Sequence, residues 1–493
     1  MKKLPLLVGV FSLVFSIACG SSHNGGGGTG TGNFSNASLS GQYVYQINGI
    51  DLGNSSAAYR EAGVFAADGN GNITSGEDDF SEGTSVSGPT SLTGSYAISN
   101  DGTGTMVLNF SGGSLNLGIT LASTSQVYLI ETDSFANGAG VAEQQNTSTL
   151  STIPAGTFAF QMHTLSGVQG SGSLAGAITA TGGVISGSDD VLRGGVFDNN
   201  TGVALTLNGL FNTPDSSGRG TGSITDSANV TTDFAYYIID ANNLRLFCID
   251  PGILGLGRAE VQTGAPFSLT SLSGGYAFGS SGDDNSFLGG VKTVGSLVAG
   301  GDGTVSGGAY DSVQDGNPVA NVSFTGSYTM DGAGRAVMTL SPGVNSTTQQ
   351  ILWMVNPQRA FLLSNDTTKV EDGAMDLQQA SSFSTSSLNG QQAFVMHGFD
   401  LTPQFVDRVG WIQWDGAGSL NWSELVNDSG VAQTSGLLSG SYSVSGNGRV
   451  AATVNGLSLS SNDIVVYLVS GSHGYMLEND AGVEINGVTT QQP

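Results

Sequence analysis

The sequence predicts an all-β protein of four tandem antiparallel units, each about 115 residues long and each a small eight-stranded up-and-down barrel. Three observations lead to this prediction. Three unrelated sequence markers repeat with one period, apolar and polar residues alternate along short runs, and glycine-rich clusters separate those runs. The first marker is a glycine two residues before an aromatic or glutamine side chain, and its copies are spaced by 115, 118 and 116 residues: Gly41, Gly156, Gly274 and Gly390.

Two further markers keep the same period. A Gly-Ser-Tyr motif or a close relative recurs with spacings of 115, 117 and 114 residues: Gly94, Gly209, Gly326 and Gly440. An aspartate that follows an apolar run recurs with spacings of 117, 116 and 114 residues: Asp133, Asp250, Asp366 and Asp480. Because three markers share one period, we interpret the chain as an array of four copies of one unit.

Strands and tight turns account for the whole of each unit. In the first unit, period-two alternation predicts strands at residues 41–48, 58–67, 71–79, 91–99, 103–110, 114–122, 126–132 and 138–145. Glycine with Asn or Asp between the runs, as at residues 68–71 and 101–104, supplies the positive φ that hairpin turns need. No stretch after residue 20 shows a sustained helical period with caps.

Eight short antiparallel strands suit a barrel, because closure removes the two exposed edges of a sheet. The Gly-x-Tyr/Phe opening strand is similar to the first strand of lipocalin- and avidin-type barrels, and this resemblance implies the same up-and-down closure. An eight-bladed β-propeller is the alternative, since each unit divides into two halves with alternating lengths near 50 and 64 residues. A β-sandwich is a third architecture.

The N-terminus has the pattern of an export signal. A basic start precedes an apolar stretch at residues 4–18, which is short for a transmembrane helix. Its end, Ser16-Ile17-Ala18-Cys19, resembles the lipobox of bacterial lipoproteins. The resemblance implies cleavage before Cys19, lipid attachment to that cysteine, and anchoring in a bacterial membrane, with the outer membrane or the cell surface as the expected location.

The expected organisation of the chain follows from these features. It comprises a signal peptide at 1–18, a lipid-anchored glycine-rich tether at 19–37, and β units at 38–150, 151–266, 267–383 and 384–493. A glycine-rich tether behaves as a flexible coil, so it would hold the units clear of the lipid surface.

Composition excludes several classes of partner. The chain carries 13 Lys and Arg against 39 Asp and Glu, a net charge of −26. Nucleic acid is therefore not expected as a partner, because its binding depends on clustered basic residues. Only two cysteines are present; with Cys19 lipidated, Cys248 has no partner and is expected to be a buried strand thiol.

Two sets of recurring acidic residues are expected to serve the scaffold. The aspartates after the seventh strand, given above as the third marker, are expected to cap turns. One acid in each eighth strand is expected to face solvent: Glu143, Glu260, Asp376 and Glu484. His163 and His397 both lie seven residues after the unit glycine, where the other units have Asn48 and Ser281, and we interpret this as a polar position on the first strand.

A calcium site is one candidate for chemistry. Asp68, Asn70 and Asn72 resemble the start of an EF-hand loop, but Ile73 stands where that loop requires glycine, and no helices flank it. A hairpin turn is the favoured interpretation, with calcium as a weak candidate. No zinc spacing, nucleophile elbow or phosphate loop occurs in the sequence, so no catalytic residue, metal or cofactor is predicted.

Tryptophans offer the last candidate site. Three of the four in the chain cluster in the fourth unit, at Trp411, Trp414 and Trp422. Such side chains stack on sugars, so they are a candidate ligand face; ordinary core packing is the competing interpretation.

The sequence therefore predicts an exported, lipid-anchored, non-enzymatic protein of the cell envelope, acting as a spacer or as a binding or adhesion module. Its expected partners are membrane lipid, through acylation, and a glycan or another surface component. A lipoprotein that binds a glycan or a small apolar ligand is the first alternative, and a hydrolase is the second.

Overall fold

A computed structural model describes residues 33–167, 170–193, 196–197, 204–284, 290–365, 369–400, 404–457 and 463–493. These residues form four closed antiparallel barrels in sequence order, each with an eight-stranded circuit. The predicted all-β class and the up-and-down barrel are therefore confirmed, and the propeller alternative is wrong. The described residues contain no α-helix, only four 3-10 turns at Asn36–Ser38, Leu52–Asn54, Leu269–Ser271 and Thr385–Ser387.

Barrel 1 shows the strand order that all four share. Its strands are β1 (Ser40–Asp51), β2 (Ala57–Asp68), β3 (Asn72–Glu82), β4 (Ser85–Ile98), β5 (Thr103–Phe110), β6 (Gly113–Ser123), β7 (Gln126–Glu131) and β8 (Ala136–Gln144). Each strand pairs with the next, and β8 pairs with β1 to close the circuit.

The other three barrels repeat this circuit. Barrel 2 contains β9 (Gly156–Ser166), β10 (Gly170–Thr181), β11 (Val184–Arg193), β12 (Val196–Phe197), β13 (Leu205–Phe211), β14 (Arg219–Asp226), β15 (Thr231–Asp240), β16 (Asn243–Cys248) and β17 (Ile253–Val261). Barrel 3 contains β18 (Ser273–Asp284), β19 (Gly290–Gly300), β20 (Thr304–Gln314), β21 (Asn317–Met330), β22 (Arg335–Val344), β23 (Thr347–Asn356), β24 (Arg359–Ser364) and β25 (Lys369–Leu377). Barrel 4 contains β26 (Asn389–Asp400), β27 (Phe405–Asp415), β28 (Ser419–Asp428), β29 (Val431–Thr434), β30 (Leu438–Val444), β31 (Arg449–Asn455), β32 (Asp463–Ser470), β33 (His473–Glu478) and β34 (Val483–Gln491). The short β12 and β29 pair beside the closed circuits, which run β10–β11–β13 and β27–β28–β30.

Each barrel encloses its own apolar core, because alternate residues of every strand point inward. In barrel 1 the inward set includes Tyr43, Ile47, Phe65, Met106 and Leu129, all at most 1% exposed. The 3-10 turn before the first strand is held by a tyrosine of the fourth strand. Thus the Tyr96 hydroxyl donates to the carbonyl of Leu39 at 2.7 Å, as Tyr328 and Tyr442 do to Leu272 and Leu388.

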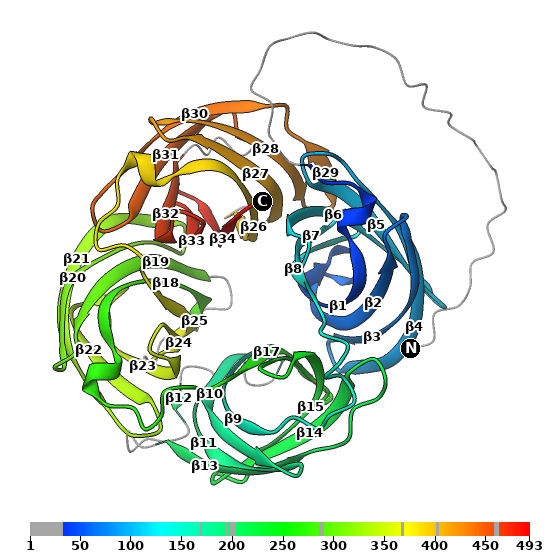
Figure 1. The fold of residues 1–493 in the computed structure, drawn as a ribbon, viewed down its shortest axis with the longest axis horizontal. Coiled ribbons are helices and arrows are strands. Elements are labelled where there is room, and N and C mark those ends of the chain that lie inside the picture. The colour runs from blue at the N-terminus through cyan, green and yellow to red at the C-terminus, as the bar shows by residue number, and fades with distance from the viewer. Residues whose placement is uncertain are drawn as a thin grey trace.

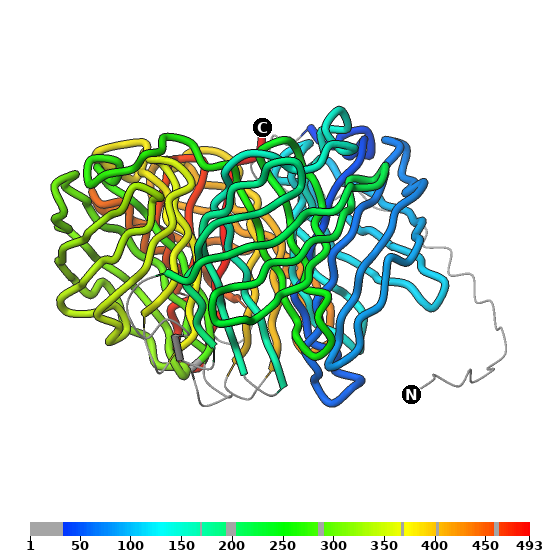
Figure 2. The backbone as a smooth tube through the Cα atoms, turned by 90° about the horizontal axis from the view of Figure 1, so that it is seen from below, coloured from blue at the N-terminus to red at the C-terminus, as the bar shows by residue number. Residues whose placement is uncertain are grey.

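The four barrels are arranged in a ring, and the last strands β8, β17, β25 and β34 turn toward its middle (Figure 1). Seen from the side, the strands run between the two faces of the ring (Figure 2). Apolar side chains fill the seams between neighbouring barrels. Representative pairs are Val64 with Tyr237, Leu192 with Trp353, Val294 with Tyr467, and Tyr128 with Val409. The units therefore form one packed assembly.

Three of the four seams share a buried aspartate and a buried aromatic residue together with a partly exposed arginine. Arg449 of barrel 4 donates from Nε and Nη2 to the two oxygens of Asp311 in barrel 3 at 2.7 and 2.6 Å, and the Tyr467 hydroxyl bonds the same carboxylate at 2.8 Å. The matching sets are Arg219, Asp79 and Tyr237 at the seam of barrels 1 and 2, and Arg335, Asp190 and Trp353 at the seam of barrels 2 and 3. Bidentate pairing fixes the relative orientation of two neighbouring barrels.

The seam between barrels 4 and 1 lacks this set of residues. Strand register places Thr103, Thr120 and Leu425 where the other seams have arginine, aromatic residue and aspartate. Leu425 packs on Gly118, where an added Cβ would lie 1.9 Å from its Cδ2. A side chain at that position would displace Leu425 from its present contact.

A buried amide cluster completes the seam of barrels 4 and 1. The Asn137 side-chain amide donates to Asp407 Oδ2 at 3.2 Å and to the carbonyl of Asn427 at 2.9 Å. The Asn427 amide in turn donates to the carbonyl of Ala136 at 2.9 Å. Both asparagines are fully buried, so this polar contact replaces the missing arginine pair in joining the two barrels.

One contact recurs at all four seams and is here called the glutamine clamp. A glutamine directly after the last strand donates from Nε2 to two backbone carbonyls of the next barrel. The clamp residues are Gln145, Gln262, Gln378 and Gln492. Because Gln492 reaches barrel 1, the ring is closed by the same contact that joins consecutive barrels.

Candidate binding site at the ring axis

Polar residues from all four barrels meet near the middle of the ring. Four of these polar residues occupy equivalent positions on the first strands, seven residues after the unit glycines: Asn48, His163, Ser281 and His397. Their neighbours Ile47, Met162 and Met396 point into the barrel cores. Because side chains alternate along a strand, the four polar residues point out of their barrels.

Two histidine–aspartate pairs lie in this region. His163 Nδ1 lies 2.7 Å from Asp372 Oδ2, across the seam of barrels 2 and 3. His397 Nδ1 lies 2.5 Å from Asp407 Oδ1 within barrel 4, and its Nε2 lies 3.5 Å from the Asn48 amide of barrel 1. The histidine contacts therefore connect barrel 2 with barrel 3 and barrel 4 with barrel 1.

Two buried cations, Arg60 and Lys292, stand beside these positions. Arg60 pairs in register with Asn48, and Lys292 pairs in register with Ser281. They are 6% and 9% exposed. Burial lowers the pKa of Arg60 to about 10, while the charge of Asp283, from the opposite barrel, acts in the other direction. Opposite barrels of a ring can interact in this way only across its middle.

The surrounding acids set the electrostatics of this axial cluster. Asp283 accepts a hydrogen bond from the Ser171 hydroxyl of barrel 2. Burial lowers the pKa of Lys292, against the opposing charges of Asp283, Glu484 and Asp372. Burial alone would lower the pKa of His163, but Asp372 and its hydrogen bond outweigh burial, so the net direction is upward. The cluster thus combines desolvated cations with carboxylates that already have partners, which suits recognition of a polar ligand.

Neither a cluster of metal ligands nor a membrane-spanning helix is found in the part of the chain that the structure describes. No group of three or more His, Cys, Asp or Glu side chains there is placed to hold a metal ion. Likewise, no helix in those ranges is long and apolar enough to cross a membrane.

The predicted calcium loop forms a hairpin turn. Asp68 Oδ1 accepts the backbone N–H groups of Asn70 and Asn72 at 2.7 and 3.0 Å, and its Oδ2 accepts the Asn72 side-chain amide at 2.7 Å. These bonds, led by the side-chain amide, lower the pKa of Asp68 to about 2. The carboxylate is thus occupied by its own turn, as the hairpin interpretation expects.

The three tryptophans do not share an exposed face. Trp414 and Trp422 are buried in the core of barrel 4. Trp411 points the other way, into the seam with barrel 1, where its Nε1 donates to Asp101 Oδ2 at 3.1 Å. The geometry therefore offers no exposed stacking surface made of all three, because strand alternation separates Trp411 from the two core residues.

The recurring acids contact strands of their own and neighbouring barrels. The side chains of Asp133, Asp250 and Asp480 each accept the backbone N–H of a strand residue 17 positions earlier, so they join strands and do not cap their own turns as expected; Asp366 lies outside the described residues. The acids of the last strands do not face solvent, which corrects that expectation. Arg245 pairs with Glu143, and Arg359 pairs with Glu260 at 2.9 Å, so these two acids join neighbouring barrels. Asp376 pairs with Arg359 of its own barrel at 2.8 Å and accepts a hydrogen bond from the Tyr475 hydroxyl of barrel 4. Glu484 accepts the N–H groups of Gly290 and Gly316 in barrel 3 at 2.9 and 2.6 Å.

Of the two cysteines, the structure describes only Cys248. Cys248 is buried and unpaired, as predicted, and burial raises the pKa of its thiol to about 12. Cys19 lies outside the described residues, as does the predicted signal peptide.

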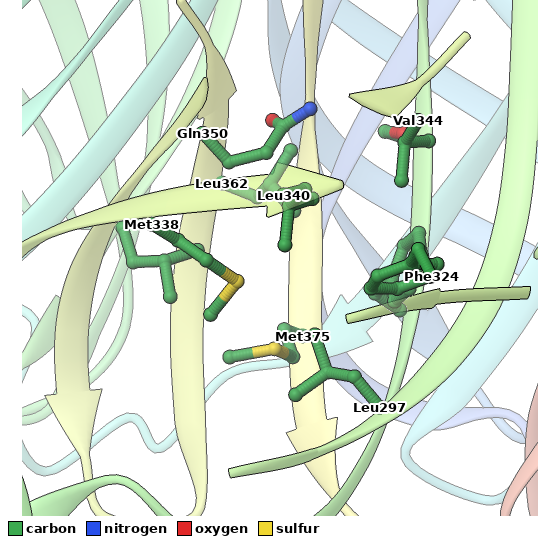
Figure 3. Close-up of a pocket in the computed structure, with 11 residues that line it drawn as sticks. Leu297, Phe324, Met338, Leu340, Val344, Gln350, Leu362 and Met375 are labelled. Carbon is green, nitrogen blue, oxygen red and sulfur yellow. The ribbon is translucent and has the colours of Figure 1, made fainter. Parts of the chain in front are cut away.

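The interior of barrel 3 leaves little room for a ligand. The space in barrel 3 lined by Phe324, Met338, Leu340 and Met375 holds about 20 Å³, on the order of one water molecule (Figure 3). A hollow of about 170 Å³ lies between barrel 2 and the segment that joins barrels 1 and 2, and is lined in part by Ile153 and Leu244. Typical small-molecule sites are roughly 300–1,000 Å³, so neither space matches one.

Sequence reasoning missed the residues that join the barrels. The seam arginines and the clamp glutamines both recur with the period of the units. Arginine follows the turn glycine at Arg219, Arg335 and Arg449, and the clamp glutamines are 117, 116 and 114 residues apart. Arg60 and Lys292 occupy equivalent positions in barrels 1 and 3, but Ser173 and Asp407 stand there in barrels 2 and 4, so the basic residue recurs only in alternate units.

No protein-family model matches the chain, and no curated protein matches it.

Proposed function

We propose that the protein is exported, held at a bacterial membrane by lipid on Cys19, and acts there as a non-enzymatic ring that binds a component of the cell envelope. The observation that carries the proposal is the axial cluster. Polar side chains of four barrels meet at one place, while the interior of barrel 3 has space for only about one water molecule. This arrangement favours recognition on the ring surface over storage of an apolar ligand inside a barrel.

The packed seams favour a binding platform over a chain of swinging spacers. Buried ion pairs, amide clusters and glutamine clamps hold the barrels in fixed relation to one another. A preorganised surface loses less conformational freedom on binding than a mobile array of modules does. Phe34 is packed against barrel 1, with its N–H bonded to the carbonyl of Asn100 at 3.1 Å. Phe34, although within the predicted tether at 19–37, therefore belongs to the packed assembly.

Fractionation of two single-cysteine variants tests the anchor. Cys19→Ser should leave the membrane fraction and appear in the soluble exported fraction, whereas Cys248→Ser, which removes the other cysteine, should stay with the membrane. Retention of Cys19→Ser in the membrane would contradict the lipid anchor.

Binding is tested separately with the soluble Cys19→Ser protein. It should co-sediment with protein-stripped cell envelopes and be saturable. A protein that stays in the supernatant at all concentrations would remove the binding platform and leave the spacer interpretation.

A further inference from the structure

We propose that the axial cluster is an oxyanion site, in which Arg60 and Lys292 hold a phosphate or carboxylate group of the ligand and His163 supplies a third donor. This inference rests on the proposed binding function and specifies its ligand chemistry. Arg60 and Lys292 form no ion pair, whereas most other cations in the described ranges do.

The other cations in the described ranges, of which only Arg408 and Lys369 are also buried, have partners. Arg193, Arg219, Arg245, Arg335, Arg359, Arg408 and Arg449 each form an ion pair with a carboxylate. Arg258 lies over the ring of Phe361, and the ammonium group of Lys369 donates to the carbonyl of Asn345. Arg60 donates only to the carbonyl of its neighbour Tyr59, at 2.8 Å, and Lys292 has no hydrogen bond or ion pair to any described residue.

A buried cation without an ion-pair partner lowers the stability of the folded state, because it has lost hydration without gaining an equivalent contact. Lys292 retains three N–H donors and Arg60 retains most of its guanidinium donors, so the unused hydrogen-bonding capacity is on the donor side. An oxyanion supplies several acceptor oxygens and pairs with arginine in a planar, bidentate geometry. Its chemistry therefore matches what the two side chains lack.

The acids of the cluster limit which anions fit. Asp283 accepts from Ser171, Asp372 pairs with His163, and Asp407 pairs with His397. Glu484 is bonded to two backbone N–H groups. None of the four forms an ion pair with Arg60 or Lys292, although the charge of Asp283 acts on both cations. These carboxylates repel any anion, and a densely charged polymer most strongly, so a ligand has to bring one isolated anionic group directly to the two cations.

Solvent reaches the cluster beside the buried cations. The side chains of His163 and His397 are 27% and 28% exposed, and they come from opposite barrels. Arg60 and Lys292 come from the other two barrels, 1 and 3. An anion at the axis would thus contact barrels on opposite sides of the ring and stabilise the closed arrangement.

Calorimetric titration of the full-length soluble Cys19→Ser protein tests the site, with inorganic phosphate and D-glucuronate as separate probes at constant ionic strength. At least one probe should bind saturably and raise the thermal unfolding temperature. Arg60→Met and Lys292→Met should each weaken that binding at least tenfold. Lys369→Met, which removes the other buried lysine of barrel 3, should leave the affinity within twofold.

The two probes distinguish phosphate-bearing from carboxylate-bearing ligands. Absence of saturable binding by both, or unchanged affinity in both axial variants, would overturn the oxyanion site. Should Arg60→Met fail to fold, Arg60→Lys provides the test, because it keeps the charge and should retain part of the affinity. Co-sedimentation of Arg60→Met or Lys292→Met with stripped envelopes, unchanged from the parent, would leave the binding platform intact while removing its anionic ligand.

Discussion

The side-chain amide of Gln492 donates a 2.6 Å hydrogen bond to the backbone carbonyl of Leu121, 371 residues earlier in the chain. Gln145 makes the same 2.6 Å contact with Ile238 in the barrel that follows its own. Barrels 4 and 1 are therefore joined by the contact that also joins consecutive barrels. Ring closure needs no special device at this point, only a copy of the last strand with its glutamine.

Gln492→Ala should loosen the ring at one seam. It removes two hydrogen bonds, so we expect the free energy of unfolding to fall by about 1–3 kcal/mol. Hydrogen exchange should accelerate at the Leu121 end of β6, because barrels 4 and 1 have no direct chain connection. Gln378→Ala is the matched control at the seam of barrels 3 and 4, where the chain itself keeps the barrels adjacent. Equal protection of β6 in both variants would contradict a role for the clamp in closure.

Arg449→Met should be strongly destabilising. It leaves the buried carboxylate of Asp311 without its bidentate partner, which costs about 3–5 kcal/mol in comparable buried pairs. The double variant Arg449→Met with Asp311→Leu should recover much of the loss, because no uncompensated charge remains. Urea unfolding of the single and double variants measures the difference. A double variant as unstable as the single one would show that packing, and not charge, holds this seam.

Barrel 1 should lose stability as the pH rises. Glu61, Asp78 and Glu131 are buried together, and burial raises the pKa of Asp78 to about 7, that of Glu131 to about 8, and that of Glu61 well above its usual value. The folded state therefore keeps protons that the unfolded chain has released above pH 5. The contribution of these three acids to the free energy of unfolding is therefore greatest at low pH, and it is lost as the pH rises through 7–8.

Glu61→Gln tests the direction of this dependence. The neutral amide removes one of the titrating groups, so the variant should show a flatter decline in unfolding free energy between pH 6 and 9. Barrel 4 has Arg408 at the equivalent position, paired with Glu424, so it does not carry the same concentration of acids. An unchanged slope in Glu61→Gln would locate the pH dependence elsewhere, for instance at Asp189, whose pKa burial raises to about 8.

Tryptophan substitutions should report packing. Trp422→Ala should lower the free energy of unfolding by about 3–5 kcal/mol, as expected for a large buried aromatic side chain. Trp411→Ala should cost less, because that side chain is only partly buried in a seam. Acrylamide should quench Trp411 emission far more than that of the two core tryptophans. Strong quenching of all three would contradict their placement.

Much of the fold could be predicted from the sequence because its determinants are local. Period-two alternation fixes which side of a strand is apolar, and turn glycines such as Gly69 and Gly71, at φ 77° and 103°, fix where hairpins end. The period of the markers fixed the number of units. These signals do not depend on where one unit lies relative to another.

The axial cluster could not be predicted in the same way. Arg60 and Asp283 lie 223 positions apart and belong to non-consecutive units. No local pattern places them near each other, since their proximity depends on closing four barrels into a ring. The last-strand acid Glu143 shows the same limit, because its alternation correctly predicts an outward direction but not the Arg245 side chain that meets it.

By itself, the sequence determined the strands, the turns and the fourfold repetition, because hydrogen bonding and burial within one unit are encoded at short range. Only the tertiary structure decided what each outward-facing residue meets. Contacts between barrels depend on the angle at which one closed sheet packs against the next, and that angle is set by side chains from distant parts of the chain acting together.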